Sequence, residues 1–185
     1  MKKIVITFGL ISGAVPSAMM LLTIPFEQQI GYDRAEVIGY TTIVLSFLLV
    51  FFGIRSYREN VARGTLTFGR GVMVGLLITL VSSACYVATW QLIYFKISPG
   101  FVEKYSAHVI AKARAEGASE ASIQATARQM QTFKEMYDQP LFNAAITFLE
   151  PFPIGVGITL ISAAILRKRA PVGSPSASSG RVQMV

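Results

Sequence analysis

The sequence predicts an all-α integral membrane protein, a four-helix bundle that crosses the bilayer four times. Four long apolar runs divide its 185 residues, and 52% of the residues are hydrophobic whereas only 15% are charged. Soluble domains carry roughly 25% charged residues. Each run meets or approaches the ~20 residues that a helix needs to cross the hydrocarbon core. Because the runs are continuous rather than alternating, we expect helices and not the strands of a closed barrel.

Lysine and arginine indicate how the four expected spans are oriented. The spans cover residues 4–26, 37–54, 71–97 and 141–166. The connection between the second and third spans is basic, and its arginines are Arg55, Arg58, Arg63 and Arg70. Basic residues concentrate in the cytoplasmic loops of membrane proteins. We therefore expect this connection and both termini to be cytoplasmic.

The net charge of +7 has two interpretations that involve the membrane. The basic connection is a candidate binding site for anionic lipid head groups, and the alternative is that it sets topology and nothing else. A nucleic-acid partner is not expected, because the basic excess lies beside the apolar runs. The lone Cys85 and His108 show none of the spacings of metal ligands, so we expect no metal or other cofactor.

Residues 98–140 are expected to form a helical hairpin outside the cytoplasm, between the third and fourth spans. Phe101 and Tyr105 recur at the four-residue spacing of an amphipathic helix. Gly117 interrupts this pattern, and Ser119 can cap a second helix. The apolar stripe of the hairpin is either a surface for a partner or lipid, or the contact between its own two helices.

Glu150 is the strongest candidate for a functional residue, because it lies inside the fourth apolar run. Ionisable side chains at membrane depth are costly and mark ion or substrate pathways. Pro151 and Pro153 follow it, and each removes a helical donor, which frees the carbonyls of Thr147 and Leu149. A broken helix with free carbonyls beside a carboxyl group can coordinate a cation or relay a proton.

Hydroxyl groups in other spans are the expected hydrogen-bond partners of Glu150, since no lysine or arginine lies at a similar depth. These hydroxyl residues are Thr42, Ser46, Ser82 and Ser83. The alternative is that they only fasten a kinked helix to its neighbours. Pro16 would distort the first span at a comparable depth, so two distorted helices could frame a cavity.

Two pairs of glycines are candidate contacts between helices. Gly9 and Gly13 lie four residues apart in the first span, and Gly71 and Gly75 lie four apart in the third. Small residues at this spacing let two helices approach closely. We expect packing within one chain, and the alternative is a homodimer.

Several stretches resemble the bacterial membrane-protein family known as domain of unknown function 4199. They are residues 51–58 (FFGIRSYR), 64–69 (GTLTFG), 117–121 (GASEA) and the segment from 136 to FLEPFPIG at 148–155. The resemblance covers residues 1–169, the expected membrane domain. It implies a small bacterial membrane protein of four helices with an extracytoplasmic helical insert, and it implies no activity. We expect the protein to lie in the inner membrane. Residues 170–185 are rich in Ser, Pro, Gly and Ala, so we expect a disordered tail.

The sequence contains no phosphate-binding glycine loop, metalloprotease helix, nucleophile elbow or catalytic dyad, so we do not expect an enzyme. The leading hypothesis is a non-enzymatic accessory or scaffold protein that acts through a membrane-protein partner, lipid or a second copy of itself. The alternative is a small dimeric transporter, or an ion or proton pathway, that uses Glu150. A membrane enzyme acting on lipid would need more than one reactive polar group at one interface.

Overall fold

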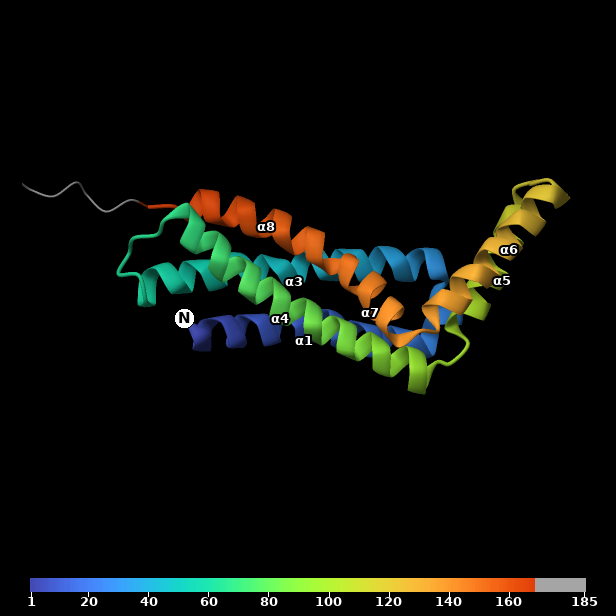
Figure 1. Ribbon diagram of the computed structural model, residues 1–185, viewed down its shortest axis with the longest axis horizontal. Helices are drawn as coiled ribbons and strands as arrows, with labels where there is room; N and C mark the ends of the chain where they lie inside the picture. The colour runs from blue at the N-terminus through green and yellow to red at the C-terminus, as the bar shows by residue number, and fades with distance from the viewer. Residues whose placement is uncertain (169–185) are drawn as a thin grey trace, which may run out of the picture.

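The computed structural model describes residues 1–168 and confirms the expected all-α fold. The expected tail at 170–185 lies outside the described residues. Four helical segments are long and apolar enough to cross a membrane (Figure 1). They are Lys2–Phe26, Tyr32–Asn60, Phe68–Ile97 and Pro140–Leu166. Exposed large hydrophobic side chains such as Leu22, Leu45, Leu80 and Ile161 occur on each of the four, as contact with lipid requires.

The first span turns sharply into the second. Helix α1 (Lys2–Thr23) contains Pro16 without being interrupted by it. A 3-10 turn, η1 (Ile24–Phe26), and a short helix, α2 (Glu27–Ile30), follow. Gly31 then reverses the chain with φ +79°, a conformation that glycine adopts without steric cost. This tight turn places α1 beside α3 (Tyr32–Asn60).

Helix α3 extends beyond the expected end at residue 54, so Arg55 and Arg58 lie on its last turns rather than in a loop. An ion pair at i, i+4 spacing between Arg55 Nε and Glu59 Oε1, 2.9 Å long, accompanies this extension. Helix α4 (Phe68–Leu92) begins where the Thr67 hydroxyl accepts a hydrogen bond from Arg70 N at 3.4 Å. It ends in a π-helical turn, η2 (Ile93–Ile97).

Two helices, α5 (Phe101–Ala115) and α6 (Glu120–Tyr137), form the hairpin between the third and fourth spans. Gly117 has φ +79° at the reversal, and the Ser119 hydroxyl caps α6 by accepting from Ser122 N at 3.2 Å. In Figure 1 the hairpin projects from one end of the bundle. The N-terminus, the connection between α3 and α4, and the end of the fourth span lie at the other end.

The fourth span is broken into α7 (Pro140–Leu149) and α8 (Pro151–Leu166), with Glu150 between them. Proline occupies the first position of each helix, where its missing N–H costs no helical hydrogen bond. At the far end, Leu66 and Lys168 exchange backbone hydrogen bonds of 2.8 and 2.9 Å. These bonds tie the α3–α4 connection to the end of α8.

The candidate glycines lie at close contacts within the chain, but the two pairs do not face each other. A Cβ atom on Gly9 or Gly13 would come within 2.7 Å of a side chain of α4. A Cβ atom on Gly71 or Gly75 would instead come within 3.0 and 2.5 Å of side chains of α8. Helix α4 is therefore the central element, because α1 packs on it through one glycine pair and it packs on α8 through the other.

Candidate functional site

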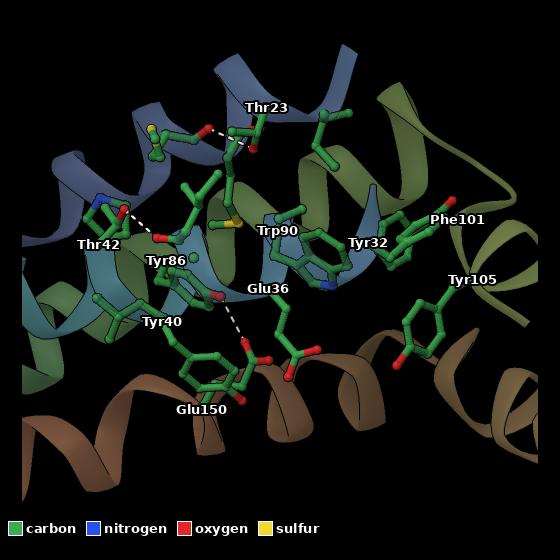
Figure 2. A pocket seen from close by; sticks show the side chains of 18 of the residues that line it. Thr23, Tyr32, Glu36, Tyr40, Thr42, Tyr86, Trp90, Phe101, Tyr105 and Glu150 are labelled. Atoms are coloured by element: carbon green, nitrogen blue, oxygen red, sulfur yellow. Dashed lines mark hydrogen bonds between the residues drawn. The ribbon is translucent and has the colours of Figure 1, made fainter. Parts of the chain in front are cut away.

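A cavity of about 390 Å³ lies near the hairpin end of the bundle, between α1, α3, α4, the hairpin and α7 (Figure 2). Its lining includes two carboxylates, Glu36 of α3 and Glu150 at the break in the fourth span. Most of the remaining lining is aromatic or aliphatic. Among the described residues that line the cavity, none is lysine, arginine or histidine. The cavity therefore combines negative charge with an apolar wall.

The helix break presents Glu150 to this cavity. Its closest hydrogen-bonding partner is Tyr86 of α4, whose hydroxyl donates to Glu150 Oε2 at 2.8 Å (Figure 2). Pro151 has no N–H, so the carbonyl of Thr147 loses the donor that a continuous helix would supply. The Glu150 side chain is exposed and lines the cavity, so a ligand in the cavity can reach it.

Helix α4 and the π-helical turn η2 that follows it carry a row of aromatic hydrogen-bond donors toward the fourth span and the end of α6. Tyr86, Trp90 and Tyr94 are four residues apart and therefore lie on one face of the helix. Their acceptors are, in order, Glu150 at 2.8 Å, the Tyr137 hydroxyl at 2.8 Å and Asp138 at 2.6 Å. Each of the three donors is therefore paired with an acceptor at its own position along the bundle. The row ties α4 and η2 to the end of α6 and to the break between α7 and α8.

Tyr137 joins this row to α7. Its oxygen accepts from Trp90 Nε1 and lies 3.3 Å from the Thr147 hydroxyl. Burial raises the pKa of Tyr137, so the phenol keeps its proton. In the contact between the Tyr137 and Thr147 hydroxyls, either oxygen can be the donor. The arrangement accounts for the burial of Thr147, which is one of the candidate residues of the broken span.

The hairpin closes one side of the cavity through aromatic contacts with the start of α3. The ring of Tyr32 packs edge-on against Phe101 and Tyr105 of α5, with centroids 6.0 and 5.6 Å apart. Just outside the cavity, Asp33 accepts a hydrogen bond from Lys112 at 3.0 Å and lies 3.5 Å from His108. His108 also packs on the Tyr32 ring, with centroids 5.1 Å apart. His108 is therefore part of the contact between the hairpin and α3.

The serines predicted to surround Glu150 do not do so. Ser12 donates to the Ser46 carbonyl at 2.9 Å and accepts from the Ser82 hydroxyl at 3.3 Å. These residues form a separate buried cluster between α1, α3 and α4. Ser83 is buried, and its hydroxyl has no hydrogen-bond partner within residues 1–168. The expectation was wrong because equal depth in the membrane does not fix which way a helix face turns.

Thr42 and Pro16 do line the cavity, as does Tyr86, which the sequence interpretation missed. The Thr42 hydroxyl donates to the Ile38 carbonyl at 2.7 Å and not to Glu150. Tyr86 was overlooked because it lies in an apolar run, where an aromatic ring indicates packing. Its phenol was nevertheless a polar group at membrane depth, and that signal was present in the sequence. Glu36 also lines the cavity; it directly precedes the second expected span, and the sequence did not predict its place in the site.

The four candidate arginines lie at the opposite end of the bundle. Arg55 and Arg58 both contact Glu59, at 2.9 and 3.2 Å, and Arg58 Nη1 also donates to the Leu166 carbonyl at 3.4 Å. The remaining two, Arg63 and Arg70, are exposed. Residues 1–168 contain no group of three or more His, Cys, Asp or Glu that could hold a metal ion.

Comparison with known proteins identifies a family but no activity. The profile of the family described as "Protein of unknown function (DUF4199)" matches residues 7–168. No curated protein and no solved structure matches the chain.

Proposed function

Because the chain belongs to this family of proteins of unknown function, we propose a role from the cavity itself: the protein binds a small ligand or ion at Glu150 as part of a pathway in the membrane. The proposal includes a bacterial inner membrane, cytoplasmic termini and an external hairpin. In that orientation the cavity lies toward the outer face of the bilayer.

The observation that supports this proposal is the exposure of Glu150 to a cavity. A glutamate that merely fastened a kinked helix would be enclosed by its partners, whereas Glu150 accepts from Tyr86 within the described part of the chain and lines open space. The volume of about 390 Å³ falls within the ~300–1,000 Å³ typical of small-molecule sites. An intramembrane carboxylate beside a broken helix is also the arrangement found where membrane proteins bind ions and substrates.

An accessory or scaffold role is the second candidate, and the hairpin favours it. The hairpin projects beyond the bundle (Figure 1), and Met136 near the end of α6 is an exposed apolar side chain outside the cavity lining. A partner protein would recognise this surface and not the cavity. The two roles therefore make opposite predictions for substitutions at Glu150 and on the hairpin.

Modification by dicyclohexylcarbodiimide tests whether Glu150 is a reachable membrane carboxyl group. This apolar reagent adds to a protonated carboxyl group and rearranges to a stable N-acylurea, which mass spectrometry of peptides locates. We expect modification at Glu150 in the protein held in a maltoside detergent, and none at that peptide in Glu150→Gln. Glu120→Gln, at the exposed start of α6, is the matched control and should leave the modification unchanged.

Flux measurements then test the pathway. Sealed vesicles containing the protein would be loaded with a pH-sensitive dye and exposed to gradients of protons, Na⁺, K⁺ and small amines. Flux that Glu150→Gln abolishes and Glu120→Gln preserves would support the pathway. An unmodified Glu150, together with no Glu150-dependent flux, would overturn the proposal and favour the accessory role.

Labelling of single cysteines tests the proposed orientation. Starting from Cys85→Ser, the change Glu120→Cys places a thiol on the hairpin and Arg63→Cys places one in the connection after α3. A maleimide that cannot cross membranes should label the first in intact spheroplasts and the second only after lysis. The reverse labelling pattern would show that the hairpin faces the cytoplasm and that the connection after α3 faces outward.

A further inference from the structure

The cavity is built to select its ligand by charge, and we propose that it binds an organic cation, an ammonium group on an apolar body, between Glu36 and Glu150. This inference rests on the proposed function, because it names the class of ligand for the same site. It is carried by the side chains that line the cavity.

Negative charge is the first property of the cavity that favours a cation. Figure 2 shows the carboxylates of Glu36 and Glu150 turned into one cavity. Two like charges that share a site repel each other, and a cation between them relieves that repulsion. Since the described lining contains no basic residue, no side chain of the cavity supplies this cation. An anionic ligand would meet only repulsion there.

The aromatic wall is the second property of the cavity that favours a cation. Tyr40, Tyr86 and Trp90 surround the inner part of the cavity, and Tyr32, Phe101 and Tyr105 line the part next to the hairpin (Figure 2). The negative faces of such rings attract cations, and cages of this kind recognise quaternary ammonium groups. The thioethers of Met19 and Met20 add a flexible apolar surface that adapts to irregular ligands.

The same lining is unsuited to a bare metal ion. Calcium takes 6–8 oxygen ligands, and magnesium requires near-octahedral coordination. Glu36 and Glu150 are the only acidic residues among the described lining residues, and no group of three or more His, Cys, Asp or Glu that could hold a metal occurs in residues 1–168. A phosphate-bearing lipid head group would bring an anion for which the described lining offers no basic partner. A free organic cation fits both the charge and the volume.

The chain provides its own reporter for binding. Trp90 is the single tryptophan of the sequence, and it lines the cavity. A ligand that enters the cavity should therefore change the fluorescence of one defined indole. The probe we choose is benzyltrimethylammonium, and its control is neopentylbenzene, which has the same shape with carbon in place of the charged nitrogen.

Titration of the purified full-length protein in a maltoside detergent is the test. We expect a saturable change of Trp90 fluorescence with benzyltrimethylammonium and none with neopentylbenzene. Glu36→Gln and Glu150→Gln should each weaken binding tenfold or more, and Glu120→Gln should not change it. Glu36 is exposed, so its variant tests the charge even if Glu150→Gln folds poorly.

Three results would overturn the inference: no saturable binding, equal binding of the neutral isostere, or unchanged binding in both glutamine variants. A zwitterionic lipid that copurifies at one copy per chain and resists displacement by the probe would also overturn it, because the cavity would then be a lipid site. If benzyltrimethylammonium does not bind but the carbodiimide still modifies Glu150, the inference fails and the proposed function stands. Failure of cation binding, together with an unmodified Glu150 and no Glu150-dependent flux, would remove both the inference and the proposed function.

Discussion

Gly155 of α8 provides the most direct test of the packing that holds the bundle together. A Cβ atom at this position would overlap the Thr79 Cγ2 methyl group and meet two ring carbons of Phe47 at 3.0 Å. Phe47 is only 1% exposed, so its ring has no free space into which to move. Gly157 lies two residues further along the same helix, and a Cβ atom there would meet nothing within 4 Å. The two glycines form a matched pair.

The size of the stability difference follows from comparing the glycine-to-alanine substitution at positions 155 and 157. Glycine to alanine gains ~1 kcal/mol of helix propensity at either site, and this gain cancels in the comparison. Forcing an extra methyl group into a packed core costs ~1–3 kcal/mol. We therefore expect Gly155→Ala to be less stable than Gly157→Ala by about 1–3 kcal/mol, a factor of roughly 5 to 150 in the unfolding equilibrium.

Reversible unfolding in maltoside and dodecyl sulfate mixed micelles, followed by far-ultraviolet circular dichroism, measures this difference. The double variant Gly155→Ala with Thr79→Ser removes the methyl group that the new Cβ overlaps, so part of the lost stability should return. Thr79→Ser keeps the hydroxyl that lies 3.4 Å from the Thr159 hydroxyl. Equal stability of the two single alanine variants would refute the close contact of α8 with α3 and α4.

Two further predictions concern the row of hydrogen bonds donated by α4 and η2. Trp90→Phe keeps an aromatic ring but removes the donor to Tyr137. It should therefore lower the free energy of unfolding by ~0.5–1.5 kcal/mol in the same circular dichroism assay. An unchanged free energy of unfolding would exclude the hydrogen bond between Trp90 and Tyr137. Hydrogen bonds from Lys134 and Tyr94 hold the pKa of Asp138 below its usual value of 3.8. The stabilisation they give is complete above pH 3.8 and is lost as the pH falls through the lowered pKa, so unfolding below that pH should be easier. Tyr94→Phe should reduce the loss of stability that occurs at acidic pH. An unchanged dependence of stability on pH would contradict a contribution of the Tyr94 hydrogen bond to the lowered pKa of Asp138.

Local properties of the sequence were enough to predict the four spans and the broken helix. Apolar length defines a span because the hydrocarbon core demands internal hydrogen bonding over ~20 residues. Pro151 cannot continue a helix from the preceding turn, so the break beside Glu150 follows from chemistry within a few residues. The hairpin bounds were also close to the expected 98–140, because Gly117 and Ser119 act through the local backbone.

The composition of the candidate site could not be predicted in the same way. Ser46 and Tyr86 both lie in the interior of spans, yet the structure places Ser46 against Ser12 and Tyr86 against Glu150. Which residue meets which depends on the rotation of each helix about its own axis, and that rotation is set by contacts such as those of Gly155 with Thr79 and Phe47.

The sequence by itself therefore determined that this chain is an all-α membrane protein with a carboxylate at a helix break, because length, hydropathy and proline act locally. Only the tertiary structure decided that Glu36, distant in sequence, lines the same cavity as Glu150 within an aromatic wall. The physical reason is that a cavity is defined by the mutual rotation and tilt of several helices, which arise from side-chain packing summed over the whole bundle.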